Sequence, residues 1–171
     1  MQYTHIYLVG MAGCGKSTLG RRLAESLKMP FVDTDQRICE IFGLSMHELF
    51  SKFGDQFIRN CEAGVLMELI GNPSTIVSTG GSLPTIKENV LLMQNHGIII
   101  HIDRPIDQIL SDIKTDRRPE LKDATSEEIL QQYSKLIGHY KACADYILDN
   151  SKGALNGQNQ LLKLLHDLKL I

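Results

Sequence analysis

The stretch Gly10-Met11-Ala12-Gly13-Cys14-Gly15-Lys16-Ser17-Thr18 decides how the rest of the sequence is interpreted. It has the form G-x-x-x-x-G-K-[ST], and it stands between an apolar run that ends at Val9 and a helical pattern that begins at Lys16. Glycines allow successive backbone N–H groups to turn inward around an anion, and the helix adds the positive end of its dipole. The pattern therefore predicts a nucleotide-binding phosphate loop, with Lys16 directed at the β- and γ-phosphates and the Ser17 hydroxyl at Mg²⁺. The residues expected to contact the nucleotide are Gly13, Cys14, Gly15, Lys16, Ser17 and Thr18.

Short apolar runs alternate with helical patterns along the chain. Five runs are predicted to be strands: residues 3–9, 31–32, 75–79, 98–102 and 146–148. Helices are expected over residues 16–28, 36–42, 56–70, 84–94, 105–113, 125–142 and 159–170, with capping boxes at Ser45/Glu48 and Thr125/Glu128. This order indicates an α/β protein with a parallel five-stranded sheet and helices on both faces. Ligands of such sheets bind at the carboxyl ends of the strands, so we expect the chemistry just after Val9, Val32, Thr79 and Ile102.

Composition and charge exclude several classes of protein. The 171 residues include 18 basic and 20 acidic side chains, a formal charge of −2, which argues against a broad basic face for nucleic acid or anionic membranes. No apolar run approaches the roughly 20 residues of a membrane span, and the N-terminus has no signal-peptide pattern. The four scattered cysteines and six unclustered histidines predict a cytoplasmic protein with reduced thiols and no metal held by the protein alone. Without a linker, residues 1–171 are expected to form a single domain.

Two aspartates follow the second predicted strand. Asp33 and Asp35 are two residues apart, so on an extended chain their side chains share a face. One interpretation gives one carboxylate to the Mg²⁺ shell and the other to an alcohol acceptor; the alternative is that the pair caps the next helix. Asp103, which ends the apolar run at residues 98–102, is a rival metal ligand in the manner of a Walker B strand.

In its succession of motifs the chain resembles the shikimate kinases, small P-loop enzymes of the nucleoside-monophosphate-kinase-like group. The loop at residues 10–18 and Asp33-Thr34-Asp35 are similar to that family's first two motifs. Gly54-Asp55-Gln56-Phe57-Ile58-Arg59-Asn60-Cys61-Glu62 resembles its G-E-x-x-F-R-x-x-E stretch, with Asp for Glu and the aromatic residue one place early. Thr79-Gly80-Gly81-Ser82 resembles its triple glycine, Arg118-Pro119 resembles the R-P of its lid, and the resemblance extends to Tyr140 and Ala144. It implies a three-layer P-loop kinase fold with an acceptor-binding helical region at about residues 34–61 and a mobile lid at about residues 112–124.

On the nucleotide side, the resemblance implies that ATP and Mg²⁺ are used. Asp33 would hold Mg²⁺ through water, together with Ser17. Lys16 and Arg118 would belong to the catalytic set, with Arg118 closing over the phosphates and stabilising the charge that is transferred.

On the acceptor side, the resemblance implies that Asp35 orients the acceptor hydroxyl and takes its proton as a catalytic residue. Arg59 would bind the acceptor's carboxylate, and Glu62 would hold Arg59 in position. Gly80 and Gly81 would let backbone amides approach the acceptor ring.

Three positions depart from the family pattern. Leu136 stands where the family has an acceptor-binding arginine four residues before the late tyrosine, here Tyr140. Ser82 replaces the third glycine, and Asp112 aligns with an upstream lid arginine, for which Lys114 is a possible substitute. The cations that could replace the arginine lost at Leu136, if the helix register shifted, are Lys135, His139 and Lys141.

The sequence thus leads to one hypothesis and two alternatives. The first is phosphorylation of a hydroxyl of shikimate, or of a similar hydroxylated carboxylic acid, by a monomer that binds small molecules and neither nucleic acid nor membrane. The second is a kinase for another small acceptor, such as gluconate or a nucleoside monophosphate. The third is a nucleotide-binding regulatory module with reduced catalysis, suggested by the altered acceptor residues.

Overall fold

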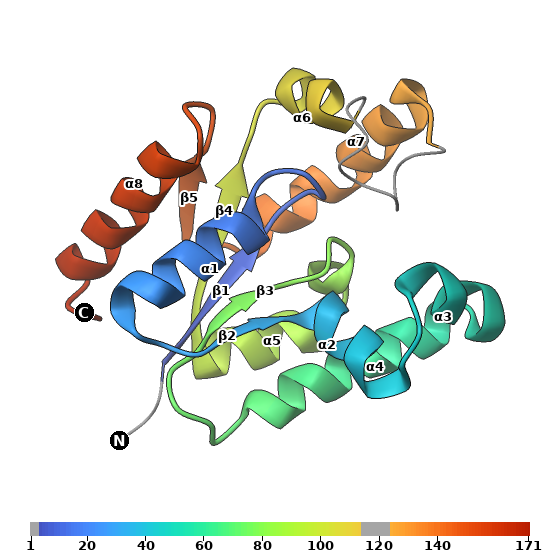
Figure 1. Ribbon diagram of the computed structural model, residues 1–171, viewed down its shortest axis with the longest axis horizontal. Coiled ribbons are helices and arrows are strands. Elements are labelled where there is room, and N and C mark those ends of the chain that lie inside the picture. The colour runs from blue at the N-terminus through green and yellow to red at the C-terminus, as the bar shows by residue number, and fades with distance from the viewer. Residues whose placement is uncertain (1–3, 114–123) are drawn as a thin grey trace.

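Five parallel strands form one sheet in the computed structural model, which describes residues 4–113 and 124–171. The strand order is β2-β3-β1-β4-β5, with every pairing parallel. The strands are β1 (His5–Val9), β2 (Phe31–Asp33), β3 (Ile76–Ser78), β4 (Gly97–Asp103) and β5 (Tyr146–Asp149). The predicted parallel five-stranded sheet is confirmed, and the carboxyl ends of its strands lie along one edge (Figure 1).

Helices cover both faces of this sheet. They are α1 (Lys16–Leu27), α2 (Thr34–Phe42), α3 (Met46–Phe53), α4 (Asp55–Leu69), α5 (Lys87–His96), α6 (Ile106–Ile113), α7 (Ser126–Cys143) and α8 (Ala154–Asp167), with a 3₁₀ turn η1 (Leu83–Thr85). Helices α1 and α8 contact each other on one face, whereas α5 and α7 contact β4 on the other (Figure 1). None of the helices within residues 4–113 and 124–171 is long and apolar enough to cross a membrane.

The hydrophobic interior consists of two clusters of unequal size. The larger one is built on the sheet, where all five residues of β1 are buried, as expected for a central strand covered on both faces. The smaller one lies among α2, α3 and α4, and its buried members are Ile38, Leu49, Ile58 and Val65. Val32, at the middle of β2, packs against both clusters. The helices that follow β2 therefore have a core of their own beside the main one.

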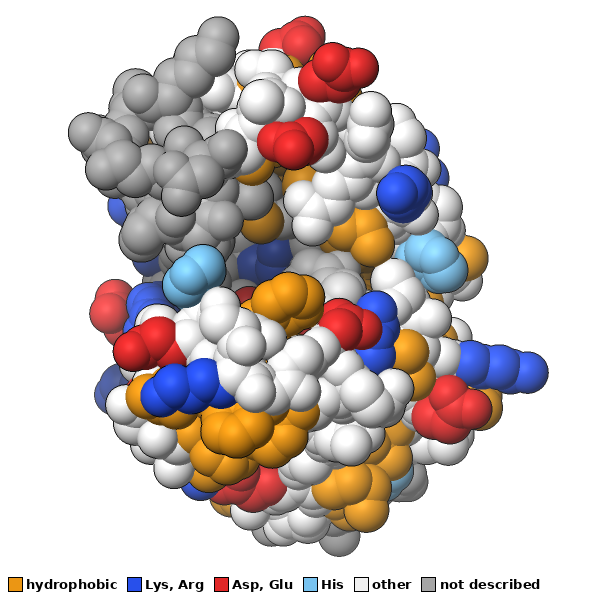
Figure 2. Space-filling model, turned by 90° about the vertical axis from the view of Figure 1, so that its right-hand side faces the viewer, with side chains coloured by type: hydrophobic (Ala, Val, Ile, Leu, Met, Phe, Trp, Pro, Cys, Tyr) orange, Lys and Arg blue, Asp and Glu red, His pale blue; other side chains and the backbone are white. Residues whose placement is uncertain are grey.

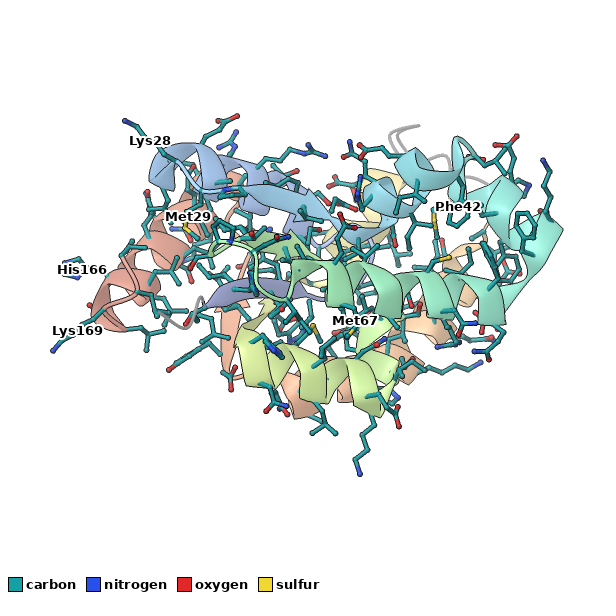
Figure 3. All side chains as sticks on the ribbon, turned by 90° about the horizontal axis from the view of Figure 1, so that it is seen from below. Lys28, Met29, Phe42, Met67, His166 and Lys169 are labelled. Atoms are coloured by element: carbon teal, nitrogen blue, oxygen red, sulfur yellow. The ribbon has the colours of Figure 1, made fainter. Side chains whose placement is uncertain are left out.

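Local sequence signals set most helix boundaries. Both predicted capping boxes are present: Ser45 accepts from the backbone N–H of Glu48, and Thr125 does the same for Glu128, while each glutamate accepts from its cap in return. Two non-glycine residues, Lys28 and Lys169, take a left-handed backbone just after α1 and α8, with φ of 54° and 56°. Figure 3 shows both lysine side chains extending away from the ribbon at the same end of the molecule.

Two predicted helices differ from the structure. The helix expected over residues 84–94 is divided into η1 and α5, because Ile86 is extended between them and the Thr85 hydroxyl bonds back to the Ser82 carbonyl at 2.7 Å. The last helix begins at Ala154, five residues before the predicted start at Asn159. Its first turn follows Gly153, whose φ of 87° turns the chain from β5 into the helix.

Candidate active site

The predicted phosphate loop joins β1 to α1 at the carboxyl edge of the sheet. Gly13 and Gly15 have φ of 90° and 105°, a left-handed backbone that favours glycine. Gly10 approaches β4 so closely that a Cβ there would lie 2.8 Å from the carbonyl oxygen of Ile102. The glycines of the motif are thus required by the backbone path itself.

Lys16 lies inside this loop with only 7% of its surface exposed. Its Nζ donates to the carbonyl oxygens of Gly10 and Met11 at 2.7 and 3.0 Å. The loop's own carbonyls thereby hold the ammonium group at the anion site, where phosphate oxygens can replace them as partners.

Ser17 and Asp33 meet at the start of α1. The Ser17 hydroxyl donates to Oδ2 of Asp33 at 2.6 Å and lies 3.0 Å from the hydroxyl of Ser78, at the end of β3. Oδ1 of Asp33 also accepts the N–H of Gln36, so this aspartate caps α2, as one of the two sequence interpretations predicted. Hydroxyl and carboxylate oxygens beside a phosphate loop are the ligands that suit Mg²⁺. Its contact with Ser17 favours Asp33 over Asp103, which lies at the end of β4.

Asp35 packs against the backbone at Gly80. A Cβ on Gly80 would lie 2.5 Å from Oδ1 of Asp35 and 3.0 Å from Oε1 of Glu62, so only glycine leaves room for both carboxylates. The N–H of Gly80 donates to the Thr34 hydroxyl at 2.8 Å. This bond fixes the glycine loop to the start of α2, and it engages the Gly80 amide that was expected to approach the acceptor.

Glu62 is a buried carboxylate beside Asp35. It is 2% exposed, it accepts a long bond from the Ser82 hydroxyl at 3.4 Å, and its Oε2 has no hydrogen-bond partner in the described part of the chain. Burial and, second, the negative charge of Asp35 raise the pKa of Glu62 to about 7. Ser82, the departure from the third glycine, therefore contacts an acidic group of the site.

Arg59 does not pair with Glu62 as predicted. Its Nε donates to Asp55 at 2.5 Å, one turn earlier on α4, and its Nη1 donates to the Thr85 hydroxyl at 3.2 Å. Glu62 affects Arg59 only through charge, since no hydrogen bond joins the two among the described residues. Asp55 and Glu62 both lie about one turn from Arg59 on α4, but Glu62 is buried and faces Ser82, whereas Asp55 is within reach of the guanidinium group. The Arg59 side chain as a whole is 28% exposed.

The aromatic residue that precedes Arg59 by two places has a structural role. Phe57 packs its ring against those of Phe53 and Phe42, with ring centres 4.6 and 5.2 Å apart, while Ile58 enters the small hydrophobic cluster. Figure 2 shows hydrophobic side chains gathered below a hollow on this side of the molecule, and Figure 3 labels Phe42 beside α4. The shift of the aromatic residue therefore leaves Ile58 at the inward position.

Leu136 and Tyr140 lie on the buried face of α7. The Tyr140 hydroxyl donates to the carbonyl oxygen of Gly81 at 2.8 Å, and Leu136 belongs to the main hydrophobic cluster with 9% of its surface exposed. The helix register is therefore not shifted, and the three cations considered as substitutes are all exposed: Lys135, His139 and Lys141. Two further predicted residues, Arg118 and Lys114, lie outside the described residues, as does most of the lid predicted at 112–124.

A cavity of about 350 Å³ opens beside the phosphate loop. It is lined by Gly13, Gly15, Thr18, Arg104, Asp112, Asn150, Gly153 and Ala154. Nδ2 of Asn150 donates to the carbonyl oxygen of Cys14 at 2.7 Å, which ties the end of β5 to the loop. The sequence interpretation missed Arg104 and Asn150; the only signal was that each follows a strand at the edge where ligands bind.

The shikimate kinase family model matches residues 12–166 of the chain. The shikimate kinase of Clostridium beijerinckii is 35% identical over 162 residues, which cover 95% of each sequence. That of Clostridium botulinum strain Eklund 17B is 37% identical over 147 residues, 85% of this chain and 88% of the relative.

Solved structures give the same result. A shikimate kinase from Acinetobacter baumannii in complex with shikimate superposes with a TM-score of 0.87 at 32% identity, covering 99% of this chain and 96% of that one. A sugar kinase from Janibacter shares only the fold, with a TM-score of 0.67 at 16% identity.

Proposed function

This chain belongs to the shikimate kinase family, and we propose that it transfers the terminal phosphate of ATP to a hydroxyl of shikimate or of a similar hydroxylated carboxylic acid. Membership makes it a small-molecule kinase. One observation carries the proposal: the hydrogen bond between Ser17 and Asp33 joins the phosphate loop to the strand end that carries Asp35. Donor phosphates at Lys16 and an acceptor hydroxyl at Asp35 would therefore meet at one edge of the sheet.

On the donor side, the loop amides and Lys16 bind the phosphates. When ATP binds, Nζ of Lys16 exchanges the carbonyls of Gly10 and Met11 for phosphate oxygens. Ser17 and Asp33 would hold Mg²⁺, and their oxygen ligands at 2.6 Å from each other suit that ion. The ion, when bound, neutralises charge on the phosphate oxygens.

On the acceptor side, Asp35 orients the acceptor hydroxyl and takes its proton as the new bond to phosphorus forms. Arg59 binds the acceptor carboxylate with the part of its guanidinium group that Asp55 and Thr85 leave open. Because the Gly80 amide is engaged by Thr34, the backbone contact with the acceptor ring falls to Gly81. Arg118, from outside the described residues, is proposed to stabilise the charge on the phosphate in transfer.

We also propose that the protein acts in the cytoplasm as a monomer on small molecules, without nucleic acid or membrane. All four cysteines are free thiols, which suits a reducing compartment. Mass measurement in solution tests the monomer: a stable dimer at micromolar concentration would contradict it.

A second acceptor class is favoured by Leu136. A buried leucine at this position supplies no cation. In the described part of the chain, Arg59 is therefore the one cation that we assign to the acceptor carboxylate. One charge-assisted hydrogen bond contributes about 1.5–3 kcal/mol, which is about one to two decades in affinity. A kinase for another small acceptor, such as gluconate or a nucleoside monophosphate, is therefore the alternative.

The test is a steady-state assay with ATP, Mg²⁺ and a panel of shikimate, gluconate and nucleoside monophosphates. We expect turnover with shikimate that is abolished in Lys16→Ala and Asp35→Asn. Phosphate transfer to another acceptor only would support the second class. ATP binding without transfer to any acceptor would leave a nucleotide-binding module and contradict the kinase assignment for this chain.

A further inference from the structure

A threonine hydroxyl lies between Arg59 and the glycine loop that follows β3. Thr85 is the last residue of η1, and its hydroxyl donates to the carbonyl oxygen of Ser82 at 2.7 Å. The same oxygen accepts an N–H of Nη1 of Arg59 at 3.2 Å. A hydroxyl group has one proton, and because the Ser82 carbonyl accepts it, the lone pairs of the oxygen are left for the arginine. The direction of the contact with Arg59 is therefore fixed.

The turn that carries Thr85 is itself anchored in the interior. Leu83 and Pro84, the two residues before Thr85, are buried. The carbonyl oxygen of Leu83 accepts a hydrogen bond from the side chain of the buried Asn89 at 3.3 Å. The position of the Thr85 hydroxyl is therefore set by the packing of η1.

The other polar groups near Arg59 give it less support. Asp55 has 57% of its side-chain surface exposed, so water competes for its carboxylate and its ion pair with Nε of Arg59 contributes little to a fixed geometry. Glu62 is buried, but its hydrogen bond is with Ser82 and not with Arg59. Of these three groups, the Thr85 hydroxyl is the one that both bonds to Arg59 and stands on a fixed support.

Residues 80–85 join the two ends of the proposed acceptor site. At one end, Gly80 packs against Asp35 so closely that a Cβ would lie 2.5 Å from the carboxylate. At the other end, Thr85 accepts the hydrogen bond from Arg59. One short turn thus sets the distance between the proposed catalytic carboxylate and the arginine proposed to bind the acceptor.

We propose that Thr85 is a positioning residue whose hydroxyl holds the guanidinium group of Arg59 in the orientation that receives the acceptor's carboxylate. This inference rests on the proposed function, because it takes Arg59 as the cation for that carboxylate. Paired hydrogen bonds between a guanidinium group and a carboxylate require the two planes to be aligned. An arginine that is aligned before binding loses little conformational entropy when the acceptor arrives, so the hydroxyl that aligns it contributes to acceptor affinity. Thr85 acts through Arg59 alone, so the chemical step should not depend on it.

The test is steady-state phosphate transfer from ATP to shikimate by Thr85→Val, which keeps the branched shape and removes the hydroxyl. We expect the KM for shikimate to rise about tenfold, with kcat within about threefold of the wild type and the Kd for ATP unchanged. Thr85→Ser, which keeps the hydroxyl, should stay within about threefold of the wild-type KM. Thr75→Val is the matched control, because it removes a threonine hydroxyl that also donates to a carbonyl oxygen at 2.7 Å, that of Pro73, at the opposite end of β3. It should leave the KM unchanged.

A double-mutant cycle with Arg59→Gln tests whether Thr85 acts through the arginine. Thr85→Val should lower kcat/KM for shikimate about tenfold in the wild type. In Arg59→Gln it should lower kcat/KM less than about twofold, because no guanidinium group is left to position.

Four results would overturn the inference. They are a KM in Thr85→Val within about twofold of the wild type, an equal rise of KM in Thr85→Ser, a loss carried by kcat or by ATP affinity, and equal losses of kcat/KM from Thr85→Val in both backgrounds. If Thr85→Val did not fold, Thr85→Ala would serve in its place, because Thr85 is only half-buried. A wild type that transfers no phosphate to shikimate, or an Arg59→Gln variant with the kcat/KM of the wild type, would contradict the proposed function and, with it, the inference.

Discussion

Replacing Gly80 by alanine would put a methyl group 2.5 Å from Oδ1 of Asp35 and 3.0 Å from Oε1 of Glu62. Ordinary contact begins at about 3.4 Å, so the Asp35 carboxylate must move by about 0.9 Å. Asp35 is a short side chain anchored in the first turn of α2, so it moves without unfolding the protein. A displacement of about 1 Å at a reacting group costs about 10²-fold in rate. We therefore expect kcat of Gly80→Ala to fall about 100-fold, with the Kd for ATP unchanged.

The assay is steady-state phosphate transfer to the acceptor that gives turnover, together with ATP titration and thermal denaturation of the same preparations. Gly64→Ala is the matched control, because Gly64 lies on α4 with no atom within 4 Å of its added Cβ. It should keep kcat and gain up to about 1 kcal/mol in stability, as alanine is the better helix former. If Gly80→Ala kept kcat within about threefold, the placement of Asp35 by Gly80 would not control the reaction. An equal loss of ATP affinity would show that the substitution disturbs the phosphate loop rather than the acceptor side.

Three further predictions concern stability. Tyr140→Phe removes the hydroxyl that donates to Gly81, and it should lower the free energy of unfolding by about 1 kcal/mol in urea denaturation; an unchanged midpoint would mean that water replaces the bond. Burial and the charge of Asp35 raise the pKa of Glu62 from 4.5 to about 7, so the folded state binds a proton on this carboxyl group more tightly than the unfolded state does. The free energy of unfolding should therefore fall by up to about 3 kcal/mol as the pH rises from about 4.5 to about 7. Glu62→Gln should remove that fall, and a variant with the same pH slope would assign it to another group. Lys28→Gly relieves a left-handed backbone after α1 and should raise stability by about 1 kcal/mol, whereas Lys28→Ala should not.

The fold was accessible from the sequence where local signals and the sheet pattern agree. The glycine and lysine spacing at residues 10–18 predicted both a strand before it and a helix after it, and both are present. The capping boxes at Ser45 and Thr125 predicted helix starts to the residue, because the bonds they make are local. The division of the predicted helix at 84–94 was not accessible, since it depends on a side-chain bond from Thr85 to Ser82 that competes with helix continuation.

The sequence predicted which motifs lie near one another in the site, but it predicted fewer of the individual side-chain contacts. Motif spacing brought Ser17 near Asp33, but it could not choose between Asp55 and Glu62 as the partner of Arg59, since both lie one turn away on the same helix. Arg104 was missed because its place in the cavity wall depends on a contact with Gly13, 91 positions away in the chain. Contacts of this kind belong to the packing of the sheet and leave no local pattern.

The two hydrophobic clusters differ in size, so the segments packed on them differ in the free energy needed for local unfolding. Lys16 and Ser17 start a helix packed on the large cluster, whereas Arg59 lies on a helix that contributes to the small cluster of Ile38, Leu49, Ile58 and Val65. Exposing those four side chains costs less free energy than unfolding the sheet. Backbone amides in α3 should therefore exchange with solvent deuterium through sub-global opening, well before those of β1. If Arg59 binds the acceptor as proposed, the acceptor could exchange through opening of this small cluster while the sheet and the phosphate loop stay folded.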